Sequence, residues 1–165
     1  MMVGSAAGAQ SPLAVRLMSY GPFEEAAFTH LPSIGVRYLF LKVPPPDQVE
    51  ATMKKLSQHA LTPLVMRGDA DLSKENCVEE LGAQLAICKK MGVKFMFLSA
   101  KRNGADKVVV FERLRRAGEV AKAHGVTITL ETHPDLCTNG DVQLETMQAI
   151  NHPNVRINFD TGNIT

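Results

Sequence analysis

The sequence predicts an α/β fold, a (β/α)8 TIM barrel truncated after about six strands. From Leu13 onward, short β-rich apolar runs alternate with longer stretches of helical period, a pattern typical of parallel sheets built from βα units. Thr165 comes directly after the last candidate strand. Because buried parallel strands need cover on both faces, this ending favours a barrel cut short over an open doubly wound sheet.

Candidate strands and helices follow one another at regular intervals. The strands begin near Leu13, Val36, Thr62, Val93, Val126 and Asn154. The helices cover residues 23–31, 46–59, 74–91, 106–124 and 141–150. In the third helix, apolar side chains recur at three- and four-residue steps, so one stripe can pack on a sheet. Gly92 and Gly125 directly follow two of the helices, where glycine favours a left-handed C-cap.

The composition indicates a single globular domain with balanced charge. The chain has 165 residues, 45% of them hydrophobic, and 18 basic against 17 acidic residues give a formal net charge of +1. We expect a disordered leader at residues 1–12 and one domain at residues 13–165. No basic footprint and no membrane-length apolar run occur, so we expect neither nucleic acid nor a membrane as partner.

The cysteines indicate the compartment in which the chain functions. There are three, an odd number, and none forms a C-x-x-C pair. This pattern argues against a disulfide framework or a structural zinc site. We therefore expect a reducing, cytoplasmic location.

Two neighbouring candidate strands each end in a carboxylate. In residues 126–131 one face is apolar, and the other carries Thr127, Thr129 and Glu131. In residues 155–160 the apolar face is formed by Val155, Ile157 and Phe159, and the polar face by Arg156, Asn158 and Asp160. In a barrel the apolar faces meet the outer helices. We therefore expect Glu131 and Asp160 to lie side by side at the C-terminal mouth.

Such a pair of carboxylates predicts a metal site. Two buried like charges repel each other unless a cation lies between them or one takes a proton. Oxygen ligands suit a divalent ion such as Mg or Mn, with Co or Zn as further candidates. The alternative is that each carboxylate pairs with a cation such as Arg156 or caps the next helix. Their matching positions on adjacent strands favour the metal.

The segments around these carboxylates resemble a known family. GVTITLETH at residues 125–133 and PNVRINFDTGN at residues 153–163 are similar to the xylose-isomerase-like TIM barrel family. That family contains sugar phosphate isomerases and epimerases, inosose dehydratases and a DNA-repair endonuclease. The similarity in strand order begins at Leu13, and the chain resembles the N-terminal portion of the family's barrel.

The resemblance implies a role for each carboxylate. Glu131 and Asp160 correspond to the first two metal ligands, and a His and a Glu from two later strands complete the family's site. Glu131 is also implied as the catalytic acid/base that moves a proton next to a carbonyl, in aldose-ketose isomerisation or 3-epimerisation. Since the later ligands are absent from this sequence, we expect little or no activity from the chain as given.

Further residues are candidates for binding a small sugar or hydroxy-carbonyl substrate. His133 follows Glu131 in the next loop, and Asn163 stands where many family members carry a His after the strand-six Asp. An amide can still hydrogen-bond a sugar hydroxyl. Lys42, Arg67 and Lys101 follow three earlier strands, where they could meet a phosphate or carboxylate, although solvated loop charges are the simpler interpretation.

Two other functions stay open at this stage. One is a non-catalytic sugar-binding or assembly module that keeps the two-carboxylate half-site. The other is phosphodiester hydrolysis on damaged DNA, for which the resemblance implies His ligands from strands two and three. Those strands end in Lys42 and Arg67 instead, which disfavours it. Open edges at the first and last strands also make a homo-oligomer possible.

Overall fold

The computed structural model describes residues 11–163 and contains a six-stranded parallel sheet. Its strands are β1 (Ala14–Arg16), β2 (Tyr38–Lys42), β3 (Thr62–Arg67), β4 (Phe95–Leu98), β5 (Thr127–Glu131) and β6 (Val155–Asn158). Each strand pairs with the next along the chain. This consecutive order is that of a (β/α) barrel, whereas a doubly wound sheet reverses its order. The predicted fold class is confirmed.

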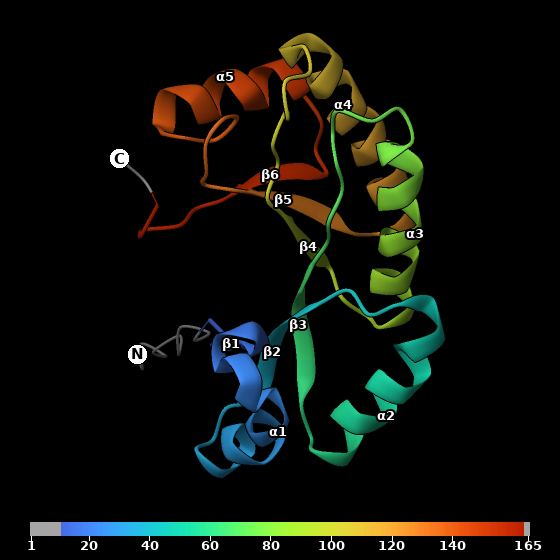
Figure 1. Cartoon of the computed structure of the whole chain (residues 1–165), viewed down its shortest axis with the longest axis vertical. Coiled ribbons are helices and arrows are strands. Elements are labelled where there is room, and N and C mark those ends of the chain that lie inside the picture. Colours follow the sequence, from blue (N-terminus) through green and yellow to red (C-terminus); the bar gives the residue numbers. More distant parts are fainter. Residues whose placement is uncertain (1–10, 164–165) are drawn as a thin grey trace, which may run out of the picture.

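Helices connect the strands. They are α1 (Glu24–Ser33), α2 (Val49–Gln58), α3 (Cys77–Lys90), α4 (Lys107–His124) and α5 (Gly140–Ile150), with 3-10 segments η1 (Leu17–Phe23) and η2 (Pro46–Gln48). Figure 1 shows the helices around the outside of the curved sheet. The edge strands β1 and β6 do not pair with each other within residues 11–163, so the sheet is an open part of a barrel.

Local chemistry sets the helix ends. The Asp106 carboxylate accepts hydrogen bonds from the backbone N–H groups of Val108 and Val109 and so caps α4. That helix ends at Gly125 in the left-handed conformation, with φ of 67°, as the sequence predicted. α3 begins at Cys77, three residues later than expected. The residues before it form a turn in which the Lys74 N–H donates to the Asp71 carbonyl.

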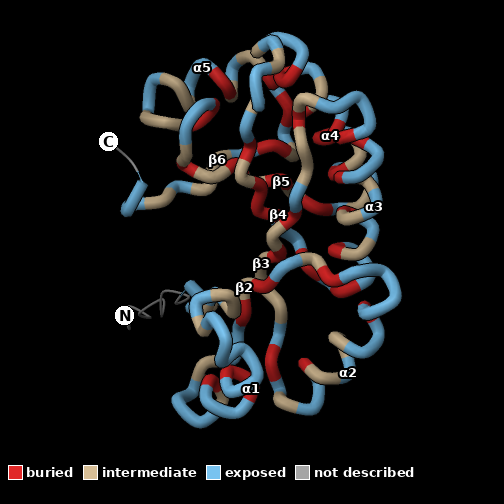
Figure 2. The backbone as a smooth tube through the Cα atoms, in the orientation of Figure 1, coloured by how far each residue is buried: buried red, intermediate tan, exposed pale blue. Residues whose placement is uncertain are grey.

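The core fills the space between the sheet and the helices. Figure 2 shows buried residues concentrated on the strands and on the helix faces turned toward them. In β5, Ile128 and Leu130 are buried on the outer face, while Thr127, Thr129 and Glu131 on the inner face are half-buried. The alternation predicted for this strand is therefore confirmed.

The end of β6 differs from the prediction. Val155 is buried and Ile157 packs against the core, but Phe159 is 63% exposed. The strand stops at Asn158, so Phe159 no longer follows the pleat that would direct it under the helices. The expected apolar face of residues 155–159 is thus wrong at its last position.

Three further sequence expectations concern the N-terminal leader, the helices as possible membrane spans, and the cysteines. Of the predicted disordered leader at residues 1–12, residues 1–10 lie outside the described part of the chain. Within residues 11–163, none of the helices combines the length and apolar character needed to cross a bilayer. All three cysteines are buried free thiols.

Candidate metal and substrate site

Glu131 is the last residue of β5 and lies on the inner face of the sheet. The alternation of Ile128 and Leu130 toward the helices fixes this orientation, because side chains along a strand alternate between its faces. Glu131 takes part in none of the ion pairs among residues 11–163. Its half-buried carboxylate is therefore available to a ligand.

Asp160 does not stand directly beside Glu131, which corrects the sequence expectation. The register pairs Glu131 with Asn158, the last residue of β6, so Asp160 lies two residues further on. Its Oδ1 accepts a hydrogen bond from the Gly162 N–H at 2.8 Å, and its Oδ2 accepts one from Asn163 Nδ2 at 3.3 Å. Both bonds leave lone pairs on the carboxylate free for a cation.

The alternative partner for these carboxylates is not used. Arg156 donates through Nη1 to the backbone carbonyls of His152 and Val155, at 2.9 and 3.0 Å. Those carbonyls lie at the start of β6, away from the mouth. Arg156 therefore neutralises neither Glu131 nor Asp160.

Thr132 ties the ends of β5 and β6 together, and sequence reasoning missed it. Its side chain is fully buried. Its Oγ1 donates to the Asn158 carbonyl at 3.0 Å and accepts from the Asp160 N–H at 3.1 Å and from Gln143 Nε2 at 3.2 Å. Because Thr132 is the next residue after Glu131, this hydroxyl holds the Asp160 backbone beside the end of β5. A threonine directly after a strand-ending carboxylate was the available signal.

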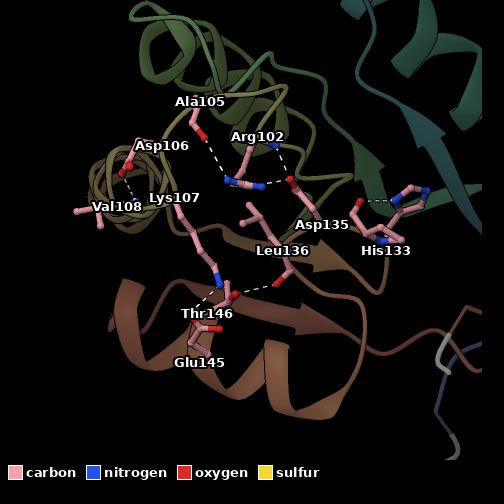
Figure 3. Close-up of polar contacts among 11 residues, drawn as sticks. Arg102, Ala105, Asp106, Lys107, Val108, His133, Asp135, Leu136, Glu145 and Thr146 are labelled. Carbon is pink, nitrogen blue, oxygen red and sulfur yellow. Dashed lines mark hydrogen bonds and ion pairs between the residues drawn. The ribbon is translucent and has the colours of Figure 1, made fainter.

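His133 sits in the loop between β5 and α5, which neighbouring elements hold in place (Figure 3). Arg102 Nε pairs with Asp135 Oδ2 at 2.7 Å, and Thr146 Oγ1 donates to the Leu136 carbonyl at 2.7 Å. The imidazole of His133 points away from the Arg102–Asp135 pair and lies within 2.6 Å of the Pro134 carbonyl through Nδ1. Burial of Asp135 raises its pKa, but the hydrogen bonds from Arg102 lower the pKa by more than burial raises it. The net shift of the Asp135 pKa is therefore downward.

Asn163, the other predicted substrate contact, donates to Asp160 through its side-chain amide and is exposed. The structure therefore brings Asn163 to Asp160. It leaves His133 on the loop that directly follows Glu131 and Thr132.

The other side of the mouth is polar and hollowed. A pocket of about 350 Å³ is lined by Arg67, Asp69, Ala70, Asp71, Lys74, Glu80, Ser99, Lys101 and Asn103. A second, of about 470 Å³, is lined by Met18, Lys42, Val43, Arg67, Asp69 and Gln84. Hydrogen bonds from Asn103 and Ser73 lower the pKa of Asp71 to about 2. Asp69 and Asp71 were not singled out in the sequence, because they lie in a loop without a periodic pattern.

The described residues suit part of a metal site rather than a complete one. Within residues 11–163, no three His, Cys, Asp or Glu side chains gather closely enough to hold a metal ion. Glu131 and Asp160 offer hard oxygen donors of the kind that Mg or Mn prefers. A full coordination sphere would need ligands from beyond these residues, from substrate or from water.

Residues 31–165 match the family described as xylose isomerase-like TIM barrel, and the chain belongs to that family. Similar solved structures include a probable 3-DHS dehydratase, AsbF, from Bacillus anthracis, with TM-score 0.75 and 18% identity over 93% of this chain and 64% of that one. An L-ribulose 3-epimerase gives TM-score 0.70 and 15% identity, covering 88% of this chain and 59% of its own. The IolI protein with a bound zinc atom gives 0.59 and 18%, covering 81% and 54%.

The similarities to these solved structures bear on the fold of the chain. At such identities they establish the fold alone, and this chain spans between 54% and 64% of the three structures. No curated protein matches the chain in sequence. The structural neighbours include sugar epimerases and a probable dehydratase.

Proposed function

We propose that this chain belongs to a metal-dependent sugar isomerase or epimerase, in which Glu131 and Asp160 supply two of the metal ligands. The observation that carries the proposal is the Glu131 carboxylate, half-buried at the C-terminal end of an inner strand face without an ion-pair partner among residues 11–163. Thr132, the residue after Glu131, accepts a hydrogen bond from the Asp160 N–H and so ties the Asp160 backbone to the end of β5. Active sites of (β/α)8 barrels lie at this end. Membership of the family, the 3-epimerase neighbours and the zinc-bound neighbour support the same function.

In this proposal Glu131 also moves a proton of the substrate. A divalent ion at the site would polarise the substrate carbonyl and stabilise the negative charge that develops on its oxygen. Glu131, at the inner end of β5, would take the proton from the adjacent carbon. In isomerisation it would deliver this proton to the neighbouring carbon, whereas 3-epimerisation would need a second acid, from beyond these residues, to protonate the same carbon from its opposite face. Proton transfer by a positioned group typically contributes about 10²- to 10⁴-fold to the rate. His133 and Asn163 would orient the sugar through its hydroxyl groups.

A second candidate is a non-catalytic sugar-binding or assembly module. The absence of a three-residue ligand cluster among residues 11–163 favours it for the chain as given. Accordingly, we expect residues 1–165 alone to bind a divalent ion with few protein ligands and to show little or no turnover. Phosphodiester hydrolysis is disfavoured, since β2 and β3 end in Lys42 and Arg67 rather than in histidines.

The test is calorimetric titration of Mn²⁺ into the wild-type chain and three variants. We expect one site, whose affinity is lost in Glu131→Gln and in Asp160→Asn. Glu79→Gln is the matched control, because Glu79 is an exposed carboxylate on the outer helix α3. Binding that survives both site substitutions, or no binding to the wild type, would contradict a half-site made by these two carboxylates.

A further inference from the structure

The C-terminal rim of the sheet is divided by charge. β2 ends in Lys42, β3 ends in Arg67, and Lys101 follows β4. β5 ends in Glu131, and Asp160 follows β6. The carboxyl ends of parallel strands lie at one edge of a sheet, so the cations occupy one side of the mouth and the proposed metal ligands the other.

The positive side is strongest between β2 and β3. Lys42 and Arg67 are register partners on these neighbouring strands, and both line the 470 Å³ pocket. Among residues 11–163 neither forms an ion pair. Asp69 is the only carboxylate in this lining, so two cations face one acid. The neighbouring 350 Å³ pocket balances its cations with an equal number of carboxylates and suits neutral hydroxyl groups better.

The backbone around Arg67 is held rigidly from both sides. Its carbonyl accepts a hydrogen bond from the Val43 N–H at 3.0 Å, and the Gly68 N–H donates to the Phe97 carbonyl at 2.9 Å. A Cβ at Gly68 would lie 2.9 Å from Met96 Sδ, so a larger residue here would displace the Met96 side chain. The half-buried Arg67 side chain therefore projects from a fixed point.

Gln84 of α3 fixes the following residue. Its Oε1 accepts from the Asp69 N–H at 2.8 Å, and its Nε2 donates to the Asp69 carbonyl at 2.7 Å. The turn after β3 is thereby fastened to an outer helix. A guanidinium on such a support can bind a carboxylate or a phosphate through two parallel hydrogen bonds at small entropic cost.

We propose that Lys42 and Arg67 form an anion subsite that binds the carboxylate or phosphate group of the substrate. The inference rests on the proposed function and narrows it: the substrate is a small sugar acid or sugar phosphate rather than a neutral sugar. β3 and β5 are two strand spacings apart, roughly 10 Å. A sugar acid or sugar phosphate can bridge that distance with its anionic end at Arg67 and its hydroxy-carbonyl end at Glu131.

The test uses three matched probes, namely glycerol 3-phosphate, glycerate and glycerol, titrated into the full chain and followed by two-dimensional amide NMR. We expect at least one of the anions to bind, with shifts around Lys42 and Arg67, and glycerol not to bind there. Tighter binding of the phosphate identifies a phosphorylated substrate, and tighter binding of glycerate a sugar acid. If glycerol bound at Lys42 and Arg67 as tightly as the two anions, the proposed anion subsite would be wrong.

Variants locate the binding and separate it from the metal site. In Arg67→Gln and in Lys42→Gln, we expect anion affinity to fall roughly tenfold or more, as for the loss of a charge-assisted hydrogen bond. Lys89→Gln, on the outer face of α3, should leave it unchanged. An unchanged affinity in Arg67→Gln with a native spectrum, or an equal loss in Lys89→Gln, would refute the proposal.

The two proposals fail separately. Asp160→Asn should abolish Mn²⁺ binding while anion binding persists, and Arg67→Gln should do the reverse. If the wild type bound the anion but not Mn²⁺, only the proposed metal function would be refuted. If it bound Mn²⁺ but not the anion, only the proposed anion subsite would be refuted.

Discussion

Replacing Thr132 with valine removes one hydroxyl at nearly constant volume. That hydroxyl makes three hydrogen bonds in a fully buried position, to the Asn158 carbonyl, the Asp160 N–H and Gln143 Nε2. A buried hydrogen bond contributes about 0.5–1.5 kcal/mol net, and an unsatisfied buried group costs more. Thr132→Val should therefore lower the free energy of unfolding by about 2–4 kcal/mol.

Two controls separate the hydroxyl from its surroundings. Thr132→Ser keeps the hydroxyl and loses one methyl group, which costs about 1 kcal/mol. Thr146→Val removes an equally buried hydroxyl that donates a single bond, to the Leu136 carbonyl. It should cost clearly less than Thr132→Val.

Urea unfolding followed by circular dichroism measures these differences, since the chain has no tryptophan for fluorescence. Amide NMR of the folded variants shows whether the segment that carries Asp160 shifts. A cost for Thr132→Val no greater than that for Thr146→Val, with the Asp160 resonances unmoved, would refute the view that Thr132 holds the two strand ends together.

Four more predictions concern the rest of the domain. Gly118→Ala places a Cβ 2.5 Å from His152 Nδ1 and should destabilise the chain by about 1–3 kcal/mol in thermal unfolding. Gly82→Ala, whose Cβ would meet only a side chain at 3.5 Å, should be neutral or stabilise by up to about 1 kcal/mol. Because the pKa of Asp135 is lowered, its ion pair with Arg102 stabilises the fold at pH values above the ordinary Asp pKa, and this stabilisation is lost as the pH falls through the lowered pKa. Arg102→Gln should therefore weaken the dependence of the unfolding free energy on acid pH. An unchanged dependence in this variant would count against the role of the ion pair. Burial raises the pKa of the Cys88 and Cys137 thiols to about 12. These thiols should therefore react slowly with a thiol reagent near pH 8 in the native chain and rapidly once the chain is unfolded.

The sequence predicted the barrel well because each unit carries its own local signals. The candidate strand starts lie within two residues of the observed ones. Buried parallel strands read as apolar runs, and glycines such as Gly125 end helices through a conformation that other residues avoid. The inner orientation of Glu131 followed from strict alternation in β5.

The site was harder to predict, because its details depend on tertiary hydrogen bonds. Alternation alone extended β6 to Asp160, whereas pairing with Thr132 ends the strand at Asn158 and turns the chain. The bond from Asn103 Nδ2 to Asp71 Oδ1 joins loops 32 residues apart, which no local pattern records. Neither the strand register nor such loop contacts can be read from residue periodicity.

The most direct test of the proposed metal half-site is to observe where paramagnetic Mn²⁺ broadens the amide resonances of the chain. We expect the resonances of Glu131, Thr132 and Asp160 to broaden first. Those of His152 and Asn154, at the opposite end of β6, should broaden much less, because the four extended residues of β6 separate the two ends by roughly 13 Å. Broadening centred elsewhere, or spread evenly over the chain, would contradict a metal site made by Glu131 and Asp160.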